Sequence, residues 1–345
     1  MKIPNNIKKQ QGISLIELMI AMTLGLLLIG SVIQIFLSTQ QSYRLQSGLS
    51  RMQENGRFAM EFLARDIRKG DYWGCVQSID IENKLNPSPG FDLFTSGIAG
   101  QDNDAIDANI VDGTDSITLR GVANDRIPVL AQPATTAANI NVINNSGLLA
   151  NDVVIISNCI AADLFQVTNV VGGGGFDNII HNTGGNPQPG DANYPGNQSA
   201  NLEAAPEPVG AAQPQANKYD SNAHIVKVSF ISYQIRLDVN NQPSLFKSTD
   251  GGNFQSFIEG VENMQILYGE DTDADNTPNY YVAAGTVGLN MDQVVSIRIS
   301  LLFASDDNIS SQARAYTYNG ITTTPADRRI RRVFSSTIAL RNRLP

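Results

Sequence analysis

The sequence predicts an α+β fold, in which one long N-terminal helix packs on an antiparallel β-sheet. Proline is absent from residue 13 to residue 70, and this stretch is apolar in its first half and amphipathic in its second. Beyond residue 110, segments of alternating apolar and polar residues recur as far as residue 340, and Asn240-Asn241 has the composition of a hairpin turn. A helix layer against an antiparallel sheet accounts for all three observations.

Residues 13–37 are predicted to form the transmembrane half of the helix. About 20 apolar residues span a bilayer core at a rise of ~1.5 Å each, and Glu17 is the one ionisable residue in this run. The run is too long for the apolar region of a signal peptide, and no small-x-small cleavage site follows it. Three lysines precede the run, at positions 2, 8 and 9. We therefore expect a single-pass protein with a cytoplasmic N-terminus and its C-terminal bulk outside the cytoplasm.

Residues 38–70 are predicted to continue this helix as its amphipathic half. One face carries apolar and small residues at steps of three and four positions, namely Leu45, Leu49, Met52, Gly56, Ala59 and Leu63. The opposite face is polar and charged, so we expect this half to pack on a domain through one side only. The alternative, a coiled coil, needs more heptads than this face provides. Gly70 is the expected stop, which makes the helix about 55 residues long.

Residues 71–345 are predicted to form an extracytoplasmic β-rich domain. Strand patterns occur at 115–121, 153–156, 164–170, 225–237, 244–247, 264–268, 294–303 and 330–340. Residues 76–113 are rich in proline and glycine and are expected to form loops. The segment 172–222 is rich in Asn, Pro, Gly and Ala and almost without apolar periodicity, so we expect a flexible insertion there.

The two cysteines, Cys75 and Cys159, both follow the predicted membrane span. Outside the cytoplasm, a disulfide is the default interpretation of such a pair. Two buried free thiols are the alternative, whereas a metal site is disfavoured because the spacing is wide and only His181 and His224 could add ligands. Trp73 is expected to anchor the end of the helix in the domain core.

The composition argues against two classes of function. The formal net charge is −9 and the isoelectric point is near 4.7, so we expect no general nucleic-acid-binding surface. The sequence has two histidines and lacks the Gly-x-Ser-x-Gly, Walker and HExxH patterns, so we expect no enzyme. The glycines at 172–175 lack the context of a phosphate-binding loop and are expected to form a flexible connection.

An acidic segment is the candidate for a metal site. Asp271, Asp273 and Asp275 alternate as do the first carboxylates of a calcium-binding loop, and Ca²⁺ is therefore the one cofactor considered. The pattern then departs, because Asn276 stands where glycine is wanted and Val282 where a bidentate glutamate belongs. A solvated acidic turn is the alternative interpretation, and we expect Ca²⁺ to bind weakly if at all.

The N-terminus resembles the prepilin signature of type IV pilins and type II secretion pseudopilins. The features that match are Lys8, Lys9, Gly12, the apolar Ile13 and Glu17. Most of that superfamily has Phe at the position of Ile13. The resemblance implies cleavage after Gly12 by a prepilin peptidase, which makes residues 1–12 a leader, and N-methylation of the new terminus on Ile13.

Later motifs resemble the PilW-type minor pilins. They are Arg65-Asp-Ile-Arg68, Gly74-Cys75, the segment 260–269, and the closing segment 332–342. The resemblance implies a pilin-like fold and a structural subunit that primes or joins a type IV pilus. Its partners would be the other minor pilins, the major pilin and the assembly machinery of the inner membrane. The protein would move from the inner membrane to the pilus, at its tip or along its shaft.

Two other functions stay open at this stage. One is a minor pseudopilin of type II secretion, and the other is an adhesive module at the pilus tip that uses 172–222 as its contact surface. In each case Glu17 is the expected assembly residue. A carboxylate within an apolar helix needs a cation, and the amine of Ile13 on an adjacent subunit would supply one.

Overall fold

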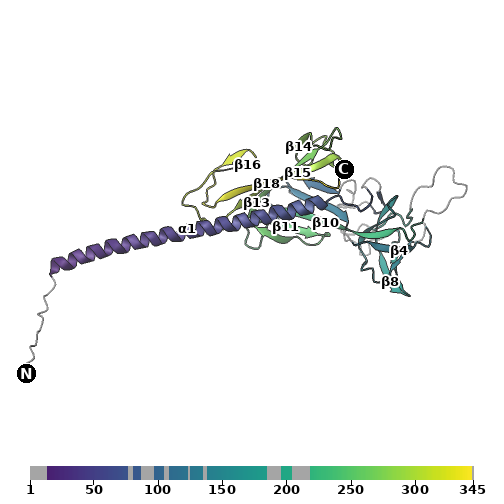
Figure 1. Ribbon diagram of the computed structural model, residues 1–345, viewed down its shortest axis with the longest axis horizontal. Helices are drawn as coiled ribbons and strands as arrows, with labels where there is room; N and C mark the ends of the chain where they lie inside the picture. The colour runs from purple at the N-terminus through teal and green to yellow at the C-terminus, as the bar shows by residue number, and fades with distance from the viewer. Residues whose placement is uncertain are drawn as a thin grey trace, which may run out of the picture.

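The computed structural model describes residues 14–76, 81–86, 97–104, 109–122, 125–134, 138–184, 196–203 and 218–343. A single long helix, α1 (Leu15–Lys69), projects far beyond a β-rich body, and the two lie together only along the C-terminal half of α1 (Figure 1). The helix has 55 residues and ends at Gly70, as predicted. The α+β class is confirmed.

The amphipathic half of α1 packs on a four-stranded antiparallel sheet with the order β14-β13-β15-β18. Its strands are β13 (Val261–Glu270), β14 (Tyr280–Val282), β15 (Val294–Ala304) and β18 (Arg331–Ala339), and a short 3-10 helix, η2 (Met291–Gln293), precedes β15. Met52, Gly56, Ala59 and Leu63 are buried in this contact, which confirms the predicted apolar face. Leu45 and Leu49, nearer the membrane half, are only half-buried.

A second sheet is organised around β10 (His224–Leu237), which serves two parts of the molecule. Its C-terminal part pairs with β3 (Ser116–Val122) and β11 (Pro243–Thr249), and residues 224–227 pair with other strands further from the N-terminal half of α1. β2 (Ile98–Gln101) and β12 (Gln255–Glu259) add to β3 and β11. We use the name proximal lobe for the part of the molecule that packs around the C-terminal half of α1. It comprises that half of α1, the four-stranded sheet, β2, β3, β11, β12 and residues 228–237. The proximal lobe has one apolar core, which includes Leu63, Ile67 and Tyr233.

The remaining strands form a distal lobe at the end of the molecule away from the free part of α1 (Figure 1). They are β1 (Ile81–Asn83), β4 (Ile127–Ala131), β5 (Asn139–Ile143), β6 (Val153–Ser157), β7 (Ala162–Gln166), β8 (Asn169–Gly173) and β9 (Phe176–Ile180), joined to residues 224–227 of β10. β6 is buried on both faces, with Val154 and Ile156 in one apolar cluster and Val153 and Ile155 in another. Burial on both sides explains its unbroken apolar sequence.

The predicted flexible insertion at 172–222 is wrong where the structure describes it. Residues 176–180 are strand β9, and Leu202 and Tyr219 are buried in the core of the distal lobe. Gly172 and Gly173 end strand β8, and Gly174 (φ 70°) and Gly175 (φ 94°) form the turn of the β8–β9 hairpin in the left-handed conformation that such turns require. Residues 185–195 and 204–217 lie outside the described residues.

The single strand predicted at 164–170 is two strands. β7 pairs with β6, whereas β8 pairs with β9, and the backbone changes partner at Val167 and Thr168. A last hairpin, β16 (Tyr316–Tyr318) and β17 (Ile321–Thr323), lies against the outer face of the four-stranded sheet, where the Tyr318 hydroxyl donates to the Ser300 carbonyl at 2.8 Å.

Candidate functional site

The membrane half of α1 presents an apolar surface that no described part of the chain covers. Its large apolar side chains are about half to four-fifths exposed, from Leu15 (78 %) to Leu37 (57 %). Two hydroxyls in this half, Thr23 and Ser31, donate to carbonyls of the preceding turn at 2.9 Å. These two hydroxyls are thus satisfied within the helix, as an apolar environment requires.

This segment passes the length and hydropathy test for a membrane span, with a mean hydropathy of 2.3 over its most apolar window. None of that window is buried within the protein. A soluble core helix would instead be covered by its own domain. The apolar half of α1 is therefore suited to lipid and to the helices of other subunits.

Glu17 lies in the first turn of α1. Its Oε2 accepts a hydrogen bond from the backbone N–H of Ser14 at 3.4 Å, and its side chain is exposed. A carboxylate at a helix N-terminus is favoured by the helix dipole. The Ser14 amide is a neutral donor, however, so it leaves the charge of Glu17 without a countercharge. Gly12 and Ile13, the predicted processing residues, lie outside the described residues.

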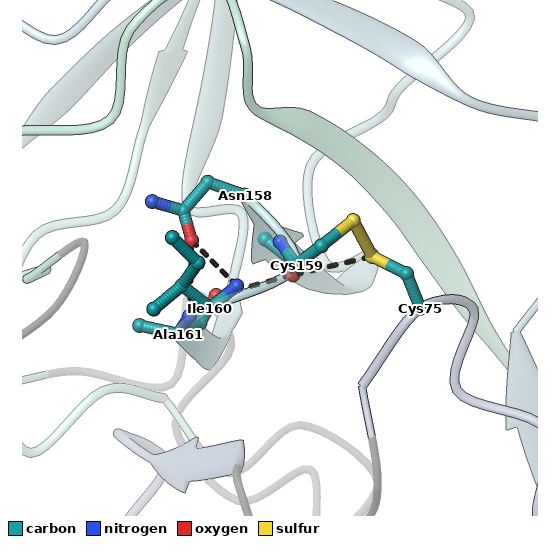
Figure 2. Close-up of a disulfide and its surroundings, with 6 residues drawn as sticks. Cys75, Asn158, Cys159, Ile160 and Ala161 are labelled. Carbon is teal, nitrogen blue, oxygen red and sulfur yellow. Dashed lines mark hydrogen bonds between the residues drawn. A yellow bond between two sulfur atoms is a disulfide. The ribbon is translucent and has the colours of Figure 1, made fainter.

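Cys75 and Cys159 form the predicted disulfide (Figure 2). Their Cα atoms are 5.2 Å apart across a sequence separation of 84 residues. Cys159 sits with φ 68° in the turn between β6 and β7, where the Asn158 side chain accepts hydrogen bonds from the Ile160 and Ala161 amides. The bond therefore fastens the segment that follows α1 to the distal lobe.

Another fastening point, at the end of α1, was not found by sequence reasoning. Asp71 (φ 61°) accepts hydrogen bonds from the Trp73 indole and the Gly97 amide and pairs with Arg343 at 2.5 Å. Asn342 donates to the carbonyls of Arg68 and Gly70, which no longer have helical partners. The C-terminal residues thus cap the long helix.

Trp73 is 3 % exposed and packs in the apolar cluster that includes Leu85 and Val153. This confirms its predicted role as an anchor where the helix meets the domain. The pairing of Asp71 with Arg343 spans most of the sequence, so no local pattern could have revealed it.

The acidic segment folds into a tight loop after β13. Ligand atoms of Asp271, Asp273 and Asp275 lie within 4.8 Å of one another, so the three carboxylates do converge. Asn276 takes φ 68°, which supplies the left-handed residue for which a calcium loop uses glycine. Val282 lies in β14 and offers no carboxylate.

Asp271 already serves the loop itself. It accepts hydrogen bonds from the amides of Asp273, Asp275 and Asn276, at 2.7 to 3.3 Å. Burial tends to raise the pKa of Asp271, but the amides of Asn276 and Asp273 outweigh it and hold the pKa below its ordinary value. These hydrogen bonds give Asp271 a structural role in the loop.

Buried polar groups in the distal lobe hold the two ends of the 204–217 segment together. Gln132 donates to the Leu202 carbonyl and accepts from the Tyr219 amide. Asp163 accepts from the Glu203 amide and the Tyr219 hydroxyl. Burial raises the pKa of Asp163 to about 6, although Lys84 and these donors oppose the shift.

His181 is another buried titratable group of the distal lobe. It is fully buried against the Phe165 ring, with a centroid separation of 4.9 Å, and neither ring nitrogen has a hydrogen-bond partner among the described residues. Burial lowers the pKa of His181 to about 4. Sequence reasoning considered His181 only as a metal ligand and did not predict this environment.

Two family comparisons match opposite ends of the chain. Residues 7–33 match the prokaryotic N-terminal methylation motif, and residues 232–342 match the family described as Type IV Pilus-assembly protein W. Both matches agree with the resemblance to PilW-type pilins. The resemblance to a PilW-type pilin with a prepilin signature, also called a class III signal sequence, is thereby confirmed. The matches support a minor pilin family of the type IV pilus.

The match to residues 232–342 covers only part of the β-rich body. It starts inside β10 and runs through β18, so it covers most of the sheet structure on which α1 packs. None of the strands β4 to β9 of the distal lobe falls within either match. No curated protein and no solved structure matches the chain.

A pilus-assembly family of this kind interacts with other pilins and with the pilus machinery. The methylation motif and the apolar helix together indicate membrane anchoring and pilus assembly. Such subunits are structural and are typically not enzymes.

Proposed function

We propose that this chain is a minor pilin, a non-catalytic subunit that primes or joins a type IV pilus after cleavage between Gly12 and Ile13. The observation that carries the proposal is the uncovered apolar half of α1 with Glu17 in its first turn. The match to the methylation motif over the same residues supports it.

Glu17 would set the position of the subunit among its neighbours. An unpaired carboxylate in lipid costs several kcal/mol or more, and the Ser14 amide does not neutralise it. Cleavage would create a cation nearby, the α-amino group of Ile13, which stays basic when it is methylated. A helical N-terminus points along the axis and away from its own fifth side chain, so the amine of an adjacent subunit is the better partner.

The rest of the apolar surface would hold neighbouring helices together without fixing their positions along the axis. Leucines at 24, 26, 27 and 28 are each more than half exposed. Apolar contacts tolerate sliding, whereas an ion pair in a medium of low dielectric does not. Glu17 would therefore fix the axial stagger between helices that the leucines hold together.

The proposal fixes location and partners as well. The N-terminus would be cytoplasmic, the body would fold in the periplasm, and the subunit would then leave the inner membrane for the pilus. Its partners would be other minor pilins, the major pilin, the prepilin peptidase and the inner-membrane assembly machinery.

Deletion of the gene distinguishes a minor pilin from a minor pseudopilin of type II secretion. We expect loss of surface pili and twitching with type II secretion intact. Loss of secretion with normal pili would instead identify a minor pseudopilin.

A chain with Gly12→Val should remain unprocessed, and a mature N-terminus other than Ile13 in the unaltered protein would contradict the assigned cleavage site.

The distal lobe favours a second candidate, an adhesive module, because it lies outside both family matches. Leu202 and Tyr219 both bind Gln132, so a short Gly-Ser linker can replace residues 204–217. If this segment is the contact surface, the shortened chain will support pili but not adhesion. Unchanged adhesion would exclude the segment from that role.

A further inference from the structure

β18 is an edge strand whose outer side has no partner in the described part of the chain. It pairs with β15 over all nine residues, from Arg331 to Ala339, and the register has no bulge. Every backbone hydrogen bond found for these residues belongs to that ladder. Five of the nine residues are exposed: Arg332, Val333, Ser335, Thr337 and Ala339.

An open edge of this kind is unusual because natural proteins protect theirs. Edge strands are normally short, bulged, charged or interrupted by proline. The other described edges follow this rule. β1, β2 and β14 have three or four residues, the β11–β12 ladder contains a bulge, and Asn169 caps the Val170 amide of the glycine-ending β8.

From Val333 to Ala339 the edge of β18 has none of these protections. The sequence Val-Phe-Ser-Ser-Thr-Ile-Ala has no charge, no proline and no glycine, and it is rich in residues that favour strands. The β16–β17 hairpin lies over the outer face of the sheet through Tyr318 and Ser300. It also reaches the start of β18, where the Arg331 guanidinium lies 5.4 Å from the Tyr316 ring centroid, and no backbone hydrogen bond joins it to residues 333–339 in the described part of the chain.

β18 also runs beside α1 and in the same direction. Phe334 lies against Gly56, and Asn342 at the other end reaches the carbonyls of Arg68 and Gly70. Figure 1 shows the strand alongside the helix. A subunit whose helix packs beside α1 would therefore bring its own body next to this edge.

The direction of β18 excludes the simplest self-association. Two copies that paired their β18 edges in antiparallel fashion would place their α1 helices in opposite directions. Two chains anchored in one membrane by the same N-terminal segment cannot do this, because their helices must point the same way. Pairing two β18 edges in parallel would keep the helix directions but would place the two helices on opposite faces of the joined sheet, where they could not pack side by side. A neighbour whose helix packs beside α1 must therefore present a different edge.

We propose that the outer edge of β18 binds an uncharged, extended strand of a neighbouring pilin of a different kind. The pairing would join the two bodies through backbone hydrogen bonds, as in other cases of strand addition. Partner residues on the helix side would pack beside Phe334 and Ile338, which face α1. This inference rests on the proposed function, since the neighbouring helix is what brings the partner strand close.

A photo-crosslinking amino acid in the full-length chain, in cells, tests the proposal at three positions. Ser335 reports on the edge, Thr322 of β17 is an exposed control on another strand, and Leu24 reports on the neighbours of the membrane half. We expect Ser335 to give an adduct with a different pilin, at least tenfold stronger than any adduct from Thr322.

The three positions separate the possible failures. Adducts with pilins from Leu24 alone would leave the proposed function intact and overturn the role of β18. An adduct from Ser335 with a second copy of this chain would also overturn it. If neither Leu24 nor Ser335 reached a pilin, both proposals would fall.

A second pair of variants removes the dependence on the bulky probe. Ser335→Lys with Thr337→Lys adds charge to the open edge, and Thr317→Lys with Thr322→Lys adds the same charge to β16 and β17, where both threonines are exposed. We expect the first pair alone to reduce co-purification of the partner pilin at least tenfold, with the Cys75–Cys159 disulfide formed in both. Equal co-purification from the two pairs would contradict the proposal.

Discussion

At the scale of single residues, Gly56 decides how closely α1 lies on its sheet. A Cβ atom there would meet the Phe334 ring at 2.5 Å. Alanine would gain up to about 1 kcal/mol of helix propensity, whereas overpacking costs about 1–3 kcal/mol. We therefore predict that Gly56→Ala lowers the free energy of unfolding by about 1–2 kcal/mol.

Urea unfolding of the full chain in detergent measures this effect. Arg57→Ala, at the exposed neighbouring position, is the control and should change little. Adding Phe334→Leu to Gly56→Ala should restore part of the loss. A Gly56→Ala chain as stable as the unaltered protein would show that the helix does not depend on this contact.

The second residue-scale prediction concerns His181 and pH. Its pKa is lowered to about 4 in the folded chain, against 6.5 for an ordinary imidazole. Between these values the unfolded state binds more protons, so the folded state loses stability as the pH falls from 6.5 to 4 and no further below that. The loss amounts to roughly 3 kcal/mol.

The variant His181→Leu removes this titration, and neither ring nitrogen has a hydrogen-bond partner to lose within the part of the chain that the structure describes. We predict that the variant resists acid better than the unaltered chain, by urea unfolding at pH 7 and pH 4.5. His224→Leu, at a partly buried imidazole, should give a smaller change. Parallel pH profiles of the unaltered chain and His181→Leu would contradict the prediction.

The acidic loop is the third residue-scale case. Since Asp271 is already engaged by three backbone amides, we expect the loop to keep its shape without an ion. Tight binding of Ca²⁺ would stabilise the folded state by mass action. We therefore predict the same melting temperature in chelator and in millimolar Ca²⁺, and a clear rise with Ca²⁺ would establish a metal site.

At the scale of elements, the disulfide joins the segment after α1 to the β6–β7 turn. A closed loop of 84 residues is worth roughly 4 kcal/mol in the chain-entropy model. We predict that Cys75→Ser with Cys159→Ser lowers stability by about 2–4 kcal/mol, measured by urea unfolding. Limited proteolysis should then cut the distal lobe first, and equal resistance of both lobes would contradict the assigned role.

Elements with strong local patterns were predictable, and those defined by their partners were not. The helix, β3, β6, β10, β15 and β18 have clear periodicity and were found close to their observed bounds. The sequence from Leu164 to Val170 alternates without interruption, although the chain changes sheets at Val167 and Thr168. Only the positions of β6 and β9 reveal that change, and they are not local information. β4 and β5 were not predicted.

At the scale of the whole molecule, the chain joins two ends that match pilin families to a distal lobe whose strands β4 to β9 lie outside both matches. The N-terminal signal was recognisable because Gly12, Ile13 and Glu17 lie close together in the sequence, and the disulfide was predictable because the chain has only two cysteines. The helix cap by Asp71, Asn342 and Arg343 was not, because its members are separated by most of the chain.

The central claim for the whole molecule is that Glu17 positions the subunit among its partners. Thr23→Ala is a matched control, since it removes a polar group of the same helix whose hydroxyl bonds only to its own carbonyls. Glu17→Ala and Thr23→Ala should both insert into the membrane and be cleaved after Gly12, because neither substitution alters the cleavage site.

Co-purification of the processed chain with the other pilins tests this claim most directly. We predict that Thr23→Ala retains its partners, whereas Glu17→Ala loses them at least tenfold, because a neighbour's Ile13 amine would then lack its carboxylate. Normal recovery of the partner pilins with Glu17→Ala would contradict the account.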